Sequence, residues 1–221
     1  MKKLIAIICS MFFVMSTLAT ATKAEIGMGV TLNYAMLDVD GYELELTGDL
    51  EKTTASKSTD VVVPEIFLEA IGDNGLAVGL SYISTRALDK VTRTDSSPTA
   101  DDEPGDAGDY TAKASISNVI MIYTDIPIGP VYAKLGFQRA QIKTEEVNPT
   151  QTTYPDKDVN GFTVGLGFKG DMPILIDDAY FKAEVTYTDY GEYKNVDSNG
   201  DHEVQADTEI TSVKLSVGKT F

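Results

Sequence analysis

Cysteine, histidine and tryptophan are nearly absent from this chain of 221 residues, which has one Cys, one His and no Trp. The single cysteine, Cys9, lies in an apolar stretch near the N-terminus. A disulfide scaffold and a catalytic thiol are therefore excluded for the rest of the chain. His202 is the single histidine, and it lies in an acidic stretch between Asp201 and Glu203. No serine nucleophile is placed beside it by the sequence, so we predict that the chain is not an enzyme.

The N-terminal segment has the three parts of a secretory signal peptide. Lys2 and Lys3 precede an apolar run at 4–14, and small residues follow that run. A membrane-anchoring helix is the alternative, but this run is shorter than the about 20 residues that a bilayer-spanning helix needs.

Two cleavage positions fit the signal peptide, after Ala21 and after Ala24. We predict a cleaved signal peptide at residues 1–24, followed by one domain at residues 25–221.

Basic residues are scarce relative to acidic ones. The whole chain has 18 Lys and Arg against 34 Asp and Glu, a formal charge of −16. Removal of Lys2, Lys3 and Lys23 would leave 15 basic residues against 34 acidic ones, a charge of −19. Such a surface disfavours nucleic acid and direct attraction to anionic lipid headgroups. It fits exposed acidic loops that could gather divalent cations.

No second long hydrophobic run is present, and helix-capping signals are missing. Apolar residues instead recur at every second position in short blocks, which is the period of a β-strand with two different faces. Eight blocks are predicted, at about 26–37, 61–71, 76–82, 113–124, 131–138, 161–168, 181–188 and 212–221.

The second face of these blocks is rich in Gly, Ser and Thr. Small residues make a poor solvent-facing surface but fill the narrow interior of an eight-stranded barrel well. We therefore predict that the apolar face points outward into lipid. The block at 113–124 is apolar on both faces through 119–122, so its orientation stays open.

The links between the blocks alternate in length. Those after the first, third, fifth and seventh blocks are long and polar, and the other three are short or marked by Pro and Gly. Short periplasmic turns and longer outer loops are typical of bacterial outer-membrane barrels. The predicted fold is therefore all-β, an eight-stranded antiparallel up-and-down transmembrane β-barrel, closed because unpaired backbone groups are costly in hydrocarbon.

The C-terminal block ends on an aromatic residue, Phe221, with apolar residues at alternate positions before it. Together with the signal peptide and the eight blocks, this ending resembles the small outer-membrane barrels of the OmpA, OmpX and opacity-protein type. The resemblance implies location in the outer membrane of a Gram-negative bacterium, contact with its lipid and lipopolysaccharide, and recognition by the barrel-assembly machinery. The assembly signal so implied consists of Val213, Leu215, Val217 and Phe221. Lys219 departs from this pattern, because an apolar residue is more usual at that position.

Six charged residues fall on the predicted inward face. Unpaired charges there would be costly, so they are expected to pair across the lumen. Glu184 and Lys214 lie at similar depth on adjacent strands and form the preferred pair. The six residues are Glu65, Glu69, Lys134, Lys182, Glu184 and Lys214.

These charges fit two functions. As a polar plug they fix a barrel that anchors in the membrane and displays long acidic loops, which is a structural or surface-interaction role. As a gate they would control a narrow porin-like barrel or one that passes small hydrophobic molecules. The plug is favoured because eight strands leave little space in the lumen. The sequence identifies no extracellular partner.

Three further patterns carry weaker hypotheses. Residues 165–170 match G-x-G-x-x-G, but a strand followed by no helix start is the wrong context for a nucleotide site. Residues 197–201 resemble the start of a calcium loop and lack its later Gly and Glu. Arg139 could meet lipopolysaccharide phosphates at the outer rim. We therefore predict no cofactor and no metal site.

Aromatic residues near the block ends are assigned to membrane-interface girdles: Tyr34, Tyr82, Tyr123, Phe137, Phe168, Tyr187 and Tyr190.

Overall fold

A computed structural model describes residues 24–47, 52–95, 108–147, 153–172 and 177–221. The predicted signal peptide, residues 1–24, lies outside these residues apart from Ala24. Among the described residues, no helix is long and apolar enough to cross a membrane.

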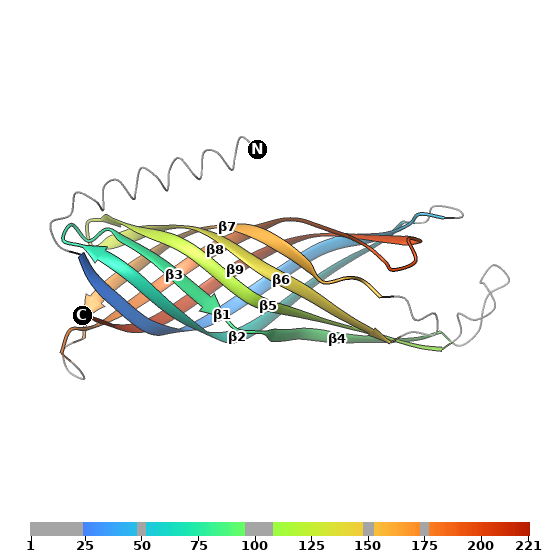
Figure 1. Ribbon diagram of the computed structural model, residues 1–221, viewed down its shortest axis with the longest axis horizontal. Helices are drawn as coiled ribbons and strands as arrows, with labels where there is room; N and C mark the ends of the chain where they lie inside the picture. Colours follow the sequence, from blue (N-terminus) through green and yellow to red (C-terminus); the bar gives the residue numbers. More distant parts are fainter. Residues whose placement is uncertain (1–23, 48–51, 96–107, 148–152, 173–176) are drawn as a thin grey trace.

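Nine β-strands make up the described chain, and each pairs antiparallel with its neighbours. In space they follow the order β3-β2-β1-β9-β8-β7-β6-β5-β4, and a further pairing of β3 with β5 closes the sheet into a ring (Figure 1). Their bounds are β1 (Ala24–Glu45), β2 (Lys52–Gly72), β3 (Ala77–Ile83), β4 (Arg86–Asp95), β5 (Gly108–Ile128), β6 (Val131–Val147), β7 (Lys157–Asp171), β8 (Ala179–Val196) and β9 (His202–Thr220).

Strands β3 and β4 count as one interrupted strand, because both pair with β5 and only residues 84–85 separate them. The ring therefore has eight positions, joined in up-and-down order. This confirms the eight-stranded antiparallel barrel predicted from the sequence.

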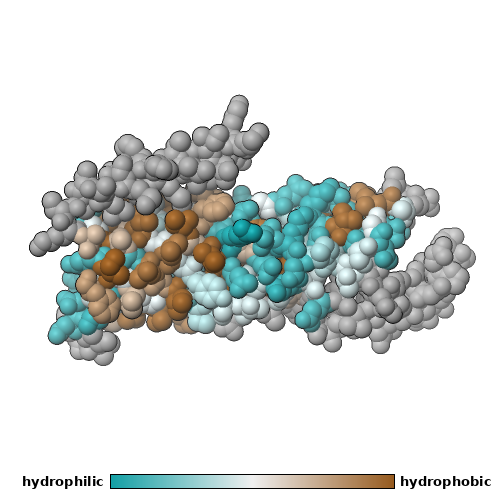
Figure 2. All heavy atoms as spheres, viewed as in Figure 1, coloured by the Kyte–Doolittle hydropathy of each residue, from teal (hydrophilic) through white to brown (hydrophobic). Residues whose placement is uncertain are grey.

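Alternation along the strands separates a lipid-like outside from a packed inside. On β1, the side chain of Val30 is 60% exposed, whereas that of its neighbour Thr31 is 5% exposed. The same pattern recurs around the ring, so the exposed apolar residues form a belt. Figure 2 shows this belt on the half of the barrel that holds the short turns, and hydrophilic side chains over the other half. The predicted outward direction of the apolar face is confirmed.

A β-bulge settles the orientation of the block at 113–124. Asn118 has a positive φ of 51°, and the pairing of β5 with β6 shifts between Ser117 and Ile120. After the bulge, Ile120 points outward and Val119 inward. Tyr123 consequently faces the lumen, at 2% exposure, so its assignment to a membrane-interface girdle was wrong.

Tyr190 on β8 is also buried, at 4% exposure, and was likewise wrongly assigned to the girdle. It belongs to an apolar cluster inside the ring with Val119, Ala140 and Val159. The lumen therefore has an apolar core toward the long-strand end, which the Gly, Ser and Thr pattern did not predict.

The long links are shorter than expected, because the strands continue far beyond the apolar belt. Residues 38–44 of β1 pair with residues 52–58 of β2 without a break, and residues 38–45 pair with residues 202–209 of β9. At the opposite end the turns are tight, as at Gly75 and Gly129, which both have positive φ. The Phe221 N–H donates to the carbonyl oxygen of Ile26 at this short-turn end, 2.9 Å away.

Candidate functional site

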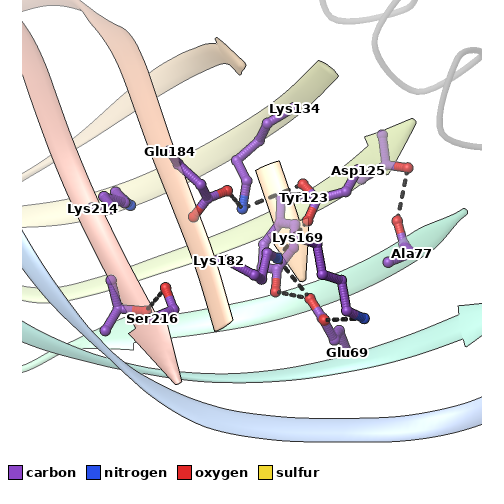
Figure 3. Close-up of polar contacts among 12 residues, drawn as sticks. Glu69, Ala77, Tyr123, Asp125, Lys134, Lys169, Lys182, Glu184, Lys214 and Ser216 are labelled. Carbon is purple, nitrogen blue, oxygen red and sulfur yellow. Dashed lines mark hydrogen bonds and ion pairs between the residues drawn. The ribbon is translucent and has the colours of Figure 1, made fainter. Parts of the chain in front are cut away.

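The candidate site is a network of buried charges in the lumen, in the half of the barrel that holds the short turns. Alternation places its members inward from β2, β5, β6, β7 and β8, and closure of the ring brings these strands around one narrow space. Figure 3 shows their side chains converging from opposite walls.

Lys182 on β8 lies at the centre of the network. Its Nζ is 2.6 Å from Oδ2 of Asp125 and 3.0 Å from Oε2 of Glu69. The lysine side chain is 3% exposed, and those of Asp125 and Glu69 are 5% and 1% exposed. One amine therefore joins carboxylates from two strands, β5 and β2.

Lys134 on β6 extends the network to a third carboxylate. Its Nζ is 2.7 Å from Oε1 of Glu184 and 3.3 Å from Oδ1 of Asp125. At the outer edge of the network, Nζ of Lys169 is 3.9 Å from Oε1 of Glu69, with a side chain that is 31% exposed. A continuous line of alternating charges thus crosses the lumen.

A separate pair lies beside this line. Nζ of Lys214 on β9 is 2.8 Å from Oε2 of Glu65 on β2, and Nδ2 of Asn33 donates to the same oxygen at 3.4 Å. The predicted pairing of Glu184 with Lys214 is therefore not the one that forms. The two residues are register neighbours on β8 and β9, but each side chain reaches across the lumen to another strand. In so narrow a barrel, contacts across the lumen decide the partners, and Glu65 would otherwise lie buried without a cation.

Two tyrosine hydroxyls donate hydrogen bonds to the carboxylate of Glu69. The hydroxyl of Tyr123 donates to Oε2 of Glu69 at 2.8 Å, and that of Tyr180 donates to Oε1 at 2.9 Å. Nζ of Lys134 also lies 3.7 Å from the centroid of the Tyr123 ring, a cation–π contact. These bonds satisfy a carboxylate that water cannot reach.

Sequence reasoning missed Asp125, which joins the two lysines. Two prolines close behind it suggested that the strand ended there. Strand β5 instead continues to Ile128, and Pro127 pairs with Tyr132 of β6 beyond Asp125, the last residue of β5 that pairs with β3. Continuing the alternation two positions past Tyr123 would have placed Asp125 inward.

With Asp125 and Lys169 included, the described lumen charges balance. A balanced, hydrogen-bonded group avoids the cost of an uncompensated buried charge, which is about 3–5 kcal/mol when one partner is removed. The four carboxylates are Glu65, Glu69, Asp125 and Glu184, and the four amines are Lys134, Lys169, Lys182 and Lys214.

Above the network, toward the long-strand end, lies a small chamber of about 60 Å³. Its walls include Val63, Ile83 and Met121, and Glu65 with Lys214 forms part of its boundary. The chamber is far smaller than the about 300–1,000 Å³ of typical small-molecule sites.

The loop between β8 and β9 holds the residues considered for calcium. Oδ1 of Asp197 accepts three backbone N–H bonds, from Gly200 at 2.7 Å, Asp201 at 2.9 Å and His202 at 3.2 Å. Burial opposes ionisation of Asp197, but these bonds outweigh it and lower the pKa of its carboxyl group. Asp197 therefore organises a turn. Within the described part of the chain, no group of three or more His, Cys, Asp or Glu is arranged to hold a metal ion.

His202 and the glycine motif also have structural positions. Nδ1 of His202 is 3.4 Å from Oδ2 of Asp197, within the same turn. Lys194 donates to Glu203 at 2.6 Å, and this bond lowers the pKa of Glu203 and raises that of Lys194. The G-x-G-x-x-G segment at 165–170 lies within β7, which is not the strand-to-helix turn that nucleotide binding requires.

Comparison with known proteins gives similarity of fold. No family model and no curated protein sequence matches the chain. Among solved structures, the outer membrane protease OmpT from Escherichia coli is 11% identical, with a TM-score of 0.45 over 91% of this chain and 98% of its own. The outer membrane protein OprG from Pseudomonas aeruginosa is 14% identical, with a TM-score of 0.44 over 89% and 97%. Ail, the attachment invasion locus protein of Yersinia pestis, is 13% identical, with a TM-score of 0.38 over 89% and 99%.

The closed sheet and its apolar belt are features of the chain itself. They give it the fold of a small outer-membrane β-barrel.

Proposed function

We propose that this chain is an outer-membrane protein of a Gram-negative bacterium with a structural or surface-interaction role. Its barrel anchors in the membrane, its short-turn end faces the periplasm, and its long acidic strands stand outside the cell. The lumen is closed by the charge network, so the barrel does not conduct.

The outer surface supports the membrane location. Leu32, Leu166 and Leu215 are 57%, 63% and 59% exposed, and they belong to the apolar belt around the ring. A water-soluble protein rarely exposes so large a contiguous apolar surface. Surrounding lipid would bury it, and the closed ladder leaves the belt without an open sheet edge.

The acidic surface supports the interaction role. On three strands, outward carboxylates follow directly above the belt: Asp38 on β1, Asp60 on β2 and Asp189 on β8. These strands continue beyond the belt as paired sheet, so the charges stand on a fixed framework.

The observation that carries the closed lumen is the position of Lys182. It contacts Asp125 of β5 and Glu69 of β2, and both carboxylates have further partners. Opening a path for ions would separate these pairs and leave buried charges uncompensated, at a cost of about 3–5 kcal/mol for each broken pair. A plug therefore fits this geometry better than a gate.

Planar-bilayer recordings test the closed lumen. The wild-type protein is expected to give no steady conductance, whereas a variant with Glu69→Ala and Lys182→Ala should give small channels, because both side chains that fill the lumen are shortened. Large steady channels from the wild type would overturn the plug and favour the porin-like alternative.

Location and orientation need a separate test. The protein should fractionate with the outer membrane and migrate differently on gels before and after heating. Protease added to intact cells should cut the long-strand end and leave the belt protected. Recovery as a soluble periplasmic protein would overturn the proposal, and protection of the long-strand end would reverse the orientation.

A further inference from the structure

A groove of about 450 Å³ lies on the outer surface of the barrel, over β5, β6 and β7. Its lining changes from apolar to polar along its length, with Ile122 and Phe137 at the apolar end and Arg139 and Asp158 at the polar end. None of the residues of the charge network described above lines this groove.

The β-bulge at Asn118 lies at the groove. There, two residues of β5 oppose one residue of β6, and a bulge of this kind bends the strand and increases its twist. The hydroxyl of Tyr82, on the neighbouring β3, donates to Oδ1 of Asn118 at 3.3 Å, which leaves the amide nitrogen as the donor end of that side chain. Oε1 of Gln141 likewise accepts a hydrogen bond from the hydroxyl of Ser117 at 3.3 Å, which leaves the amide nitrogen of Gln141 as a donor.

Strand register places the groove across the edge of the apolar belt. Ile122 pairs with Phe137, and Ile120, two residues earlier on β5, pairs with Arg139. Arg139 in turn pairs with Asn160, and Gln141 with Asp158. An apolar half and a half with hydrogen-bonding and charged groups therefore meet within one depression.

The polar end of the groove carries a positive charge, unlike the other described strands just above the apolar belt. The first outward charged residue above the belt is acidic on β1, β2 and β8, whereas on β6 it is Arg139. The side chain of Arg139 is 64% exposed, and its guanidinium group contacts the carboxylate of Asp158 through one nitrogen. A guanidinium has five N–H donors in a planar fork, so one such contact leaves donors directed to the groove.

We infer that this groove binds one phosphorylated glycolipid of the outer leaflet, with an acyl chain against Ile120, Ile122 and Phe137 and a phosphate at Arg139. A depression within a lipid-facing belt must be filled by an acyl chain, because water there would have no polar partners. Guanidinium groups recognise phosphate through paired, charge-assisted hydrogen bonds. The amide groups of Asn118 and Gln141 supply further donors at the same end.

This inference rests on the proposed outer-membrane location, and its test separates the two. Binding of diphosphoryl lipid A to the purified, folded protein is measured by native mass spectrometry. The matched ligand is the same lipid with both phosphates removed. Wild-type protein should retain one diphosphoryl lipid and bind the dephosphorylated form about tenfold or more weakly, as expected for loss of charge-assisted hydrogen bonds.

Two variants distinguish recognition from structural support. Arg139→Gln should lose about tenfold or more in binding of diphosphoryl lipid A, to the level of the dephosphorylated lipid. Asp158→Asn also breaks the ion pair but keeps the guanidinium, so it should bind at least as well as wild type. Equal losses in both variants would show that only the ion pair matters and would overturn the inference. Unchanged binding by Arg139→Gln would do the same.

A third variant tests the apolar half. Ile122→Trp fills the groove and should reduce binding of both lipids, and unchanged binding of both would place the lipid elsewhere. Each variant is first checked for the outer-membrane location and heat-dependent gel migration of the wild type. Wild-type protein found outside the outer membrane would overturn the proposed function, whereas correctly located protein with insensitive lipid binding would overturn only the groove.

Discussion

Tyr123 lies directly opposite Gly79 in the pairing of β3 with β5, and its ring fills the space that a Cβ on residue 79 would need. That Cβ would be 2.3 Å from Cζ of the ring. Tyr132 has the same relationship with Gly167 on the neighbouring strand, at 2.2 Å. The inward glycines thus make room for the tyrosines that surround the charge network.

Gly79→Ala should therefore destabilise the barrel by about 1–3 kcal/mol, the usual cost of overpacking a filled interior. Unfolding in urea, followed by heat-dependent gel migration, measures the change. Gly191→Ala is the matched control, because a Cβ there would meet no atom closer than 3.8 Å. Equal stability of the Gly79→Ala protein and the wild type would contradict this account of the glycine face.

Lys182→Met should destabilise the folded barrel by about 3–5 kcal/mol, because it leaves Asp125 and Glu69 buried without their shared cation. Adding Asp125→Asn and Glu69→Gln to that change removes the uncompensated charges and should restore much of the loss. The same urea assay reports both proteins. Lys143→Met, at an exposed ion pair, should have an effect below about 1 kcal/mol. A triple variant no more stable than the single one would show that shape, and not charge, is what Lys182 contributes.

Acid should loosen the turn between β8 and β9. The folded-state pKa of Asp197 lies below its ordinary value of about 3.9. Its stabilising effect is therefore complete above that value and is lost as the pH falls through the lower, folded-state pKa. Hydrogen-exchange protection of the Gly200 and Asp201 amides, relative to Val185 in the belt, should fall in this acidic range.

Asp197→Asn supplies the control for the turn. It keeps the accepting oxygen but has no carboxyl group to titrate, so protection should be lower than in wild type and nearly constant across the same pH range. A wild-type turn whose protection stays constant would contradict the role assigned to the Asp197 carboxylate.

Phe221→Ala should lower the amount of protein assembled in the outer membrane while changing the urea midpoint of the assembled protein little. Phe221 is 69% exposed, so its ring packs against little of the barrel, whereas the backbone bonds to Ile26 do not depend on the ring. Quantitative blotting of membrane fractions measures assembly. Lys219→Ala, two positions away, is the control, and equal assembly of Phe221→Ala and wild type would remove the predicted assembly signal.

The sequence was sufficient to predict the ring, because a period of two with a small-residue face is a local property of each strand. It also identified the inward direction of Glu69, Lys134 and Lys182, which follows from the same period. Partners across the lumen could not be predicted in this way. The choice of Glu65 over Glu184 by Lys214 depends on the closure of the ring, which no single strand encodes.

Two further differences between the predicted and the observed structure have local causes. The orientation of the apolar block around Val119 depends on one residue, Asn118, whose positive φ shifts the pairing, and Asn in such a block gave no clear sign of a bulge. Asp125 was overlooked because Pro127 suggested a strand end. Strand β3 pairs with β5 only as far as Asp125, so Pro127 lies at an edge of the ladder, where proline is tolerated, and the strand continues.

The continuation of the strands past the belt determines what an approaching molecule meets. Leu44 on β1 pairs with both Lys52 and Glu203, so the outer portion of these strands is a hydrogen-bonded sheet and not a set of independent loops. An antibody or receptor would then recognise side chains brought together from different strands. Linear peptides copied from one strand would reproduce only a single row of that surface, which makes the folded barrel the appropriate bait and immunogen.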